Sequence, residues 1–235
     1  FALLSNSWKS IKPFARHRIV FLLSQSEKFS SDRLPDIKGD INISVPEQLV
    51  ANEMLLEPSL KKRKHDPNSV TDVPLPVSAS RAMLMQQATV PCNKHLVELI
   101  DTVKPCIREL IDHANLIKMW IAYLIPRIED GNNFGVSVQE DTLSEARQVE
   151  SEAATYLDQI SRYFITRGKV ISKIAKYPHV EDYRRTVIEL DEKEFISMRL
   201  VLCELRNQYS SLHDLIIKNL DKIKKPRNAN TDNMY

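Results

Sequence analysis

Three long stretches of helical periodicity dominate the chain after residue 90. Apolar residues recur every three or four positions over about 93–125, 139–176 and 179–224, which predicts amphipathic helices. Such helices would be roughly 45 to 65 Å long, far above the ordinary length, so a compact globule of short elements is excluded. Pro178 and Pro226 end the second and third stretches. Long antiparallel helices with short connections predict an all-α, up-and-down bundle.

Each stretch carries one apolar stripe that we expect to face the core. Pro105 lies inside the first stretch, where it would kink the helix or remove one hydrogen bond. The stripes comprise Leu96, Val103, Ile107, Ile117 and Leu124 in the first stretch, Leu143, Ala146, Val149, Ala153, Ile160, Phe164, Ile171 and Ile174 in the second, and Tyr183, Val187, Leu190, Met198, Leu202, Leu205, Tyr209, Leu212, Ile216 and Ile223 in the third.

A four-helix bundle needs one more helix, and only residues 1 to 30 could supply it. The apolar stripe there is weak and is broken by Pro13; it consists of Trp8, Ile11, Phe14, Ile19 and Leu22. We therefore divide the chain into four parts. These are an atypical N-terminal segment that would provide the first bundle helix (1–43), a proline-rich loop (44–88), the main helical bundle (89–227) and a C-terminal tail (228–235).

Composition and motifs exclude several classes of protein. The formal net charge is only +2, which argues against a dedicated nucleic-acid binder. No apolar run approaches the roughly 18 residues of a membrane span, and three cysteines without a CxxC pair fit neither a disulfide framework nor a zinc site. Catalytic signatures are absent, and Glu109 with His113 has the wrong spacing for a di-iron ligand pair. We expect no enzyme, no cofactor, no metal ion and no membrane partner.

The link between the first two long helices, residues 126–135, stands out by composition. It holds two of the four glycines of the chain, Gly131 and Gly135, on either side of Asn132 and Asn133. Gly and Asn tolerate positive φ, so this link is expected to adopt a defined, unusual backbone. Two interpretations remain open: a simple hairpin turn, or a loop presented to a partner.

Two further segments could each have a functional role, or could have none. The basic cluster Lys61, Lys62, Arg63 and Lys64 reads as a nuclear import signal or as a solvated run of charge. The tail 228–235 could offer Met234, Tyr235 and a terminal carboxylate to a partner's pocket, or it could be a frayed end.

Four strings, taken together, resemble the REG family of proteasome activators, and its gamma type in particular. They are IPRIEDGNNFGVSVQE, ESEAATYLDQISRYFITRGK, SKIAKYPHVEDYRRTV and ELDEKEF, and the resemblance covers residues 89–235. It implies a four-helix-bundle subunit that forms a homo-oligomeric, seven-membered ring. The ring would cap the core proteasome, without ATP or ubiquitin, mainly in the nucleus with some in the cytoplasm.

The resemblance also implies roles for particular residues. The segment 127–135 would be the activation loop that opens the proteasome's gate, with Asn132 most critical. Met234 and Tyr235 would dock on the end-ring subunits, and Lys169 would be a channel position that influences which peptidase activities are stimulated. The other loop residues would shape or support the loop; they are Arg127, Glu129, Asp130, Gly131, Asn133 and Gly135.

Two rival functions stay open at this point. A structural or adaptor bundle without a proteasome role explains the long helices but not the loop. A nucleic-acid or membrane-surface binder would use the basic cluster at 61–64 and the basic start at 9–18, against a near-neutral net charge.

Overall fold

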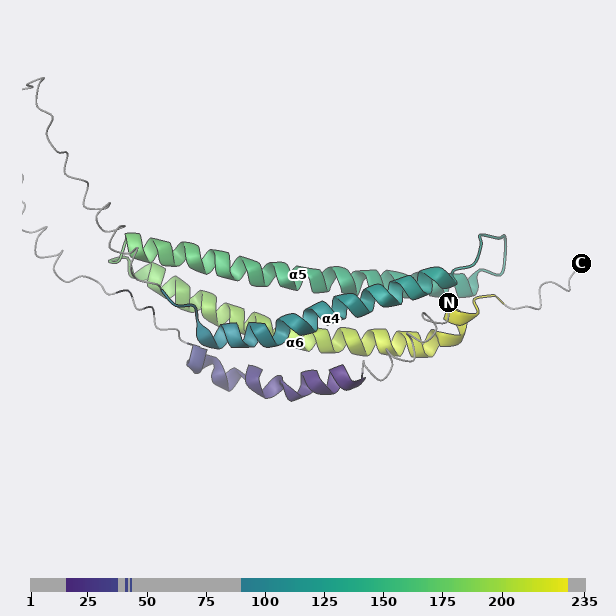
Figure 1. Ribbon diagram of the computed structural model, residues 1–235, viewed down its shortest axis with the longest axis horizontal. Coiled ribbons are helices and arrows are strands. Elements are labelled where there is room, and N and C mark those ends of the chain that lie inside the picture. Colours follow the sequence, from purple (N-terminus) through teal and green to yellow (C-terminus); the bar gives the residue numbers. More distant parts are fainter. Residues whose placement is uncertain (1–15, 38–40, 42, 44–89, 228–235) are drawn as a thin grey trace, which may run out of the picture.

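The computed structural model describes residues 16–37, 41, 43 and 90–227 of the chain. Three long helices dominate these residues: α4 (Lys94–Leu124), α5 (Phe134–Lys176) and α6 (Glu181–Lys224). They run side by side in alternating directions and form an elongated bundle (Figure 1). No strand occurs in the described ranges. The expected all-α, up-and-down bundle is therefore confirmed.

Each long helix ends just before a proline. Ile125, which precedes Pro126, has φ −66° and ψ 122°, and the residues preceding Pro178 and Pro226 are likewise non-helical. The proline ring disfavours helical geometry in the residue before it, which fixes all three ends. Pro105 does not interrupt α4, which is continuous through it. The second helix begins at Phe134, five residues before the predicted start at Gln139.

The core forms along the predicted apolar stripes of the three helices. Most stripe residues are buried, including Ile107 on α4, Ile160 on α5 and Leu205 on α6. Phe164 is an exception, since it is 38% exposed while Tyr163 beside it is buried. The phenol of Tyr163 donates a hydrogen bond to Asp191 Oδ1 on α6 at 2.9 Å. This bond satisfies the buried hydroxyl, so the tyrosine can lie in the core.

The N-terminal segment supplies a short and interrupted fourth element. Residues 16–24 are α-helical, and two 3₁₀ helices follow, η1 (Ser26–Phe29) and η2 (Ser31–Ile37). They pack against α4 and α6 on the side away from α5 (Figure 1). Leu22 is buried and Ile19 packs against the core, as the weak stripe predicts. The helix is broken rather than continuous, and the segment extends the contact to Ile37.

A buried polar network fixes this segment to the start of α4. Asn93 caps α4 by accepting a hydrogen bond from Leu96 N, and its amide donates to the Ile37 carbonyl (2.7 Å) and to Asp191 (2.9 Å). Arg167 Nε donates to Asp191 Oδ1 at 2.9 Å, and both side chains are at least nine-tenths buried. Asp191 on α6 thus joins α5 to the cap of α4, and the Asn93 amide joins that cap to η2.

Several predicted features lie outside the described residues. These are the first 15 residues of the N-terminal segment, the proline-rich loop with Lys61, Lys62, Arg63 and Lys64, and the tail with Met234 and Tyr235. None of the helices in the described part of the chain is long and apolar enough to cross a membrane.

Candidate functional site

The link between α4 and α5 lies at the end of the bundle where α6 also ends (Figure 1). It comprises residues 125–133 and stands out from the helices as a loop. Two large apolar side chains at the loop, Ile128 and Phe134, are 102% and 74% exposed. Ile128 is thus the most exposed of the large apolar side chains in the described residues.

The backbone of this loop is unusual at its centre. Gly131 has φ 86° and Asn132 has φ 48°, and Asn132 is the single non-glycine residue with positive φ in the described ranges. Positive φ is sterically costly for most L-residues, and asparagine is among those that tolerate it best. The expected special backbone at Gly131 and Asn132 is therefore confirmed.

Arg227, the residue after the proline that ends α6, holds the base of the loop. Its Nη1 lies 2.9 Å from Glu129 Oε2, and its Nη2 donates to Asn133 Oδ1 at 3.1 Å. The Asn133 amide donates in turn to the Glu129 carbonyl at 3.0 Å. These three contacts close residues 129–133 into a ring of interactions, with Gly131 and Asn132 at its tip.

Gly135 brings the start of α5 against the same C-terminal segment. A Cβ atom there would lie 2.1 Å from the Pro226 carbonyl oxygen, so no other residue fits without displacement. Gly135 is helical and belongs to the first turn of α5, which corrects its expected place in the loop. Its requirement comes from close backbone approach and not from positive φ.

Gln139 ties the ends of α4 and α6 together behind the loop. Its side chain is fully buried, and its amide donates to the Leu124 carbonyl at 3.0 Å and to the Ile223 carbonyl at 2.7 Å. The last carbonyls of a helix lack partners within the helix, and the Gln139 amide satisfies one of them in each of the two helices. The loop and the end of α6, with Pro226 and Arg227 behind it, therefore form one fixed unit.

The remaining predicted loop residues, Arg127 and Asp130, are exposed. Lys169 is also exposed, but it lies 35 residues into α5, about 50 Å along the helix from its start. The structure thus gathers the loop residues at one end of the bundle and separates Lys169 from them.

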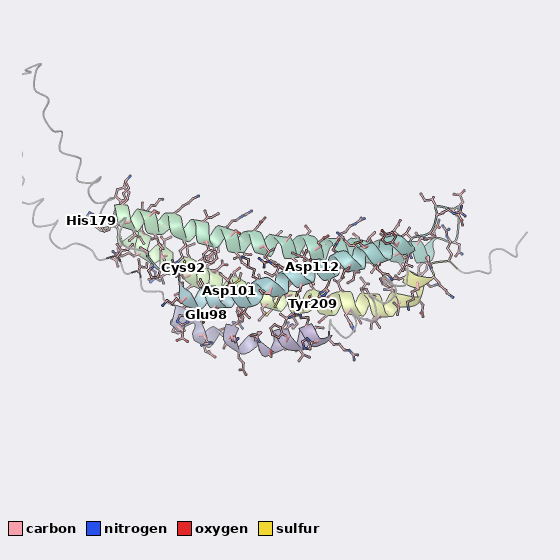
Figure 2. All side chains as sticks on the ribbon, viewed as in Figure 1. Cys92, Glu98, Asp101, Asp112, His179 and Tyr209 are labelled. Atoms are coloured by element: carbon pink, nitrogen blue, oxygen red, sulfur yellow. The ribbon has the colours of Figure 1, made fainter. Side chains whose placement is uncertain are left out.

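Glu109 and His113, the nearest approach in the sequence to a di-iron ligand pair, contact two different residues. Glu109 forms an ion pair with Arg18 of the N-terminal segment, while His113 Nδ1 lies 2.9 Å from the Tyr209 hydroxyl. Burial lowers the pKa of His113. The described residues contain no group of three or more His, Cys, Asp or Glu side chains suited to a metal ion. His179 lies at the far end of the bundle from the loop (Figure 2).

Sequence reasoning missed two residues of this site, Arg227 and Gln139. Gln139 has a signal in the sequence, because it stands four positions before Leu143 and so continues the apolar stripe of α5 with a polar residue. Arg227 has none, since its contacts join positions 94 and 98 residues apart that only the fold brings together.

Comparisons with known proteins agree on one family. The family described as "Proteasome activator PA28, C-terminal" matches residues 89–233. "Proteasome activator complex subunit 3" of Gallus gallus is 54% identical over 205 residues, covering 86% of this chain and 79% of the relative. The protein of the same description from Homo sapiens is 53% identical with the same coverage.

Solved structures show the same fold. "Crystal structure of the 11S subunit of the Plasmodium falciparum proteasome, PA28" superimposes with a TM-score of 0.58 at 29% identity, covering 97% of this chain and 93% of that chain. A chain of the structure described as "a proteasome-11S activator complex" has a TM-score of 0.55 at 15% identity, with 97% of this chain and 96% of that chain covered.

Proposed function

The chain belongs to the PA28 family of proteasome activators, and we propose that it binds the end ring of the core proteasome and opens its gate. The role is regulatory: the chain itself cleaves nothing and needs no ATP. The observation that carries the proposal is the loop 125–133 with consecutive positive φ at Gly131 and Asn132. Such a loop, fixed at the tip of a rigid bundle, can contact one conformation of a partner specifically.

The loop and the tail have separate tasks in this proposal. A ligand shifts a conformational equilibrium only by its difference in affinity for the two states. Docking by Met234 and Tyr235 supplies affinity without favouring an open gate. The loop around Asn132, with Ile128 exposed beside it, contacts the open gate and so supplies that difference.

Assembly into a ring follows from the weakness of a single tail. A short peptide that becomes ordered on a pocket gains little affinity after its entropy cost. A ring of seven identical subunits presents several tails at once, and avidity of this kind multiplies affinity by about 10² to 10⁴. We propose such a homoheptamer, which sedimentation would distinguish from a monomer or dimer.

The direct test is hydrolysis of short fluorogenic peptides by purified latent core proteasome. We expect the full chain to stimulate hydrolysis and a variant without residues 228–235 to lose stimulation because it no longer binds. The truncated variant must sediment as the same oligomer as the full chain. A truncated ring that stimulates as well as the full chain would contradict docking by the tail.

Two further roles complete the proposal. Lys169 would lie on the channel wall and influence which peptidase activities rise, which Lys169→Glu tests by comparing substrates with basic, acidic and apolar residues at the cleavage site. The basic cluster at 61–64 would direct the chain to the nucleus. Replacing its four residues with alanine should shift a fluorescent fusion toward the cytoplasm.

A further inference from the structure

We propose that Arg227 is a positioning residue that couples docking of the tail to gate opening. It binds the activation loop and directly precedes the tail in the chain. The inference rests on the proposed function and adds to it a mechanical link between two tasks. Arg227 is one residue from the tail, which starts at Asn228, and it touches the loop at two places. A tail that docks therefore carries the loop with it.

The contacts of Arg227 lie on both sides of Gly131 and Asn132, the two loop residues with positive φ. Glu129 and Asn133 lie on either side of residues 130–132, and the guanidinium of Arg227 binds both. The Asn133 amide also donates to the Glu129 carbonyl, so the two residues that Arg227 binds are joined to each other. A non-glycine residue with positive φ persists where its surroundings fix it. Arg227 supplies that constraint for Asn132, whose φ is 48°.

The pair is poorly suited to a purely structural role. The Glu129 side chain is 57% exposed and that of Arg227 is 20% exposed, at the very end of the bundle. An ion pair whose carboxylate stays exposed to water contributes little to global stability. The planar fork of arginine nevertheless fixes the geometry of its two acceptors, which one ammonium cannot do to the same degree. Local order of the loop is what such a contact controls.

These contacts explain how docking of the tail can limit the position of the activation loop. The eight residues 228–235 can extend over at most about 28 Å, so docking of the tail end confines Arg227 to within that distance of the docking pocket. Because Arg227 is bound to the loop, the same restriction applies to Asn132. Gly135 against Pro226 and Gln139 against Ile223 keep the end of α6 and the start of α5 in register behind it.

The test compares the full chain with Arg227→Ala in two measurements. The first is hydrogen exchange of loop amides 127–133 in the free protein. The second is a titration of latent proteasome that separates maximal stimulation from the half-maximal concentration. We expect loop exchange to rise about three- to ten-fold and maximal stimulation to fall by a similar factor, as for loss of a charge-assisted contact. The half-maximal concentration should change less than about two-fold.

Two companion variants sharpen the comparison. Arg227→Lys keeps the charge opposite Glu129 but loses the fork, so it should recover part of the stimulation. Lys225→Ala removes a positive charge two positions earlier, from an exposed side chain, and should behave as the unchanged chain. All variants should unfold at the same denaturant concentration, because the helices are untouched.

Distinct outcomes overturn distinct claims. Unchanged loop exchange in Arg227→Ala would refute the holding contact whether or not a proteasome is present. Increased exchange with undiminished maximal stimulation would refute its role in gate opening. A higher half-maximal concentration with the same maximum would instead make Arg227 part of the docking surface and overturn the proposal. An unaltered chain that forms a ring but never stimulates would refute the proposed function itself.

Discussion

The α-carbon of Gly135 faces the carbonyl of Pro226 so closely that a Cβ atom would lie 2.1 Å from that oxygen. The first turn of α5 and Pro226, the second residue after α6, are thus in direct backbone contact, behind the loop that carries Asn132. Neither side of this contact is a flexible side chain. The start of α5 and the C-terminal segment can therefore approach this closely only because Gly135 has no Cβ atom.

Gly135→Ala should displace the Pro226 segment from α5. We expect a loss of about 1–3 kcal/mol in unfolding free energy, as for overpacked sites, together with reduced stimulation of the proteasome. Urea unfolding at one fixed protein concentration measures the first effect, since oligomer stability depends on concentration.

Gly168→Ala is the matched control for that substitution. Gly168 is also in α5, but a Cβ atom there meets nothing within 4 Å. Alanine should therefore raise the unfolding free energy by about 0.5–1 kcal/mol through better helix propensity. Equal effects at the two glycines would show that the Pro226 contact has no energetic consequence.

Glu194 makes the stability of the bundle depend on pH. It is 6% exposed, its Oε1 lacks a hydrogen-bond partner among the described residues, and burial raises its pKa to about 7. Lys193 opposes this shift only in part. An unfolded carboxyl releases its proton near pH 4.5, whereas the folded one retains it to about pH 7. The unfolded state therefore binds fewer protons in this window, and stability falls as pH rises.

Glu194→Gln should remove this dependence. At pH 8 the variant should be more stable than the unaltered chain by about 3 kcal/mol, and near pH 4.5 the two should be alike. Urea unfolding at several pH values gives the comparison. Glu189→Gln is the control, because the Glu189 side chain is 55% exposed. A constant difference between Glu194→Gln and the unaltered chain from pH 4.5 to 8 would contradict the account.

Asp191 should be far more important for stability than exposed ion pairs. Asp191→Ala leaves Arg167 as a buried charge without its carboxylate and removes the acceptor for Tyr163 and Asn93. Removal of one partner from a buried pair costs about 3–5 kcal/mol. Arg185→Ala, which loses only the exposed pair with Glu189, should cost about 0.5 kcal/mol or less. Similar unfolding free energies for the two variants would show that the network is not needed.

The long helices could be predicted because their signals are local. Apolar residues at helical spacing set the faces of α4, α5 and α6, and Pro178 and Pro226 set the ends of α5 and α6. The strings around IPRIEDGNNFGVSVQE indicated the family, and that assignment is confirmed. Positive φ at Gly131 and Asn132 also followed from residue type.

The features that escaped prediction depend on distant partners. Burial of Tyr163 in place of Phe164 depends on Asp191 on another helix, since both positions fit the helical spacing after Ile160 and phenylalanine is the more apolar side chain. The N-terminal segment is divided into short helices, and η1 and η2 contact α6, a helix far away in the sequence. Arg227 meets Glu129 only because three helix ends converge. No periodicity in the sequence encodes such contacts.

The central claim, that the loop opens the gate while another part binds, is tested most directly by Asn132→Tyr. Tyrosine accepts positive φ less readily than asparagine and adds a large ring at the tip of the loop. The measurement is peptide hydrolysis by latent core proteasome with the unaltered chain, with the variant, and with both together. The account predicts that the variant forms the same ring, fails to stimulate alone, and in excess suppresses stimulation by the unaltered chain. A variant ring that stimulates as fully as the unaltered chain would contradict the assignment of gate opening to this loop.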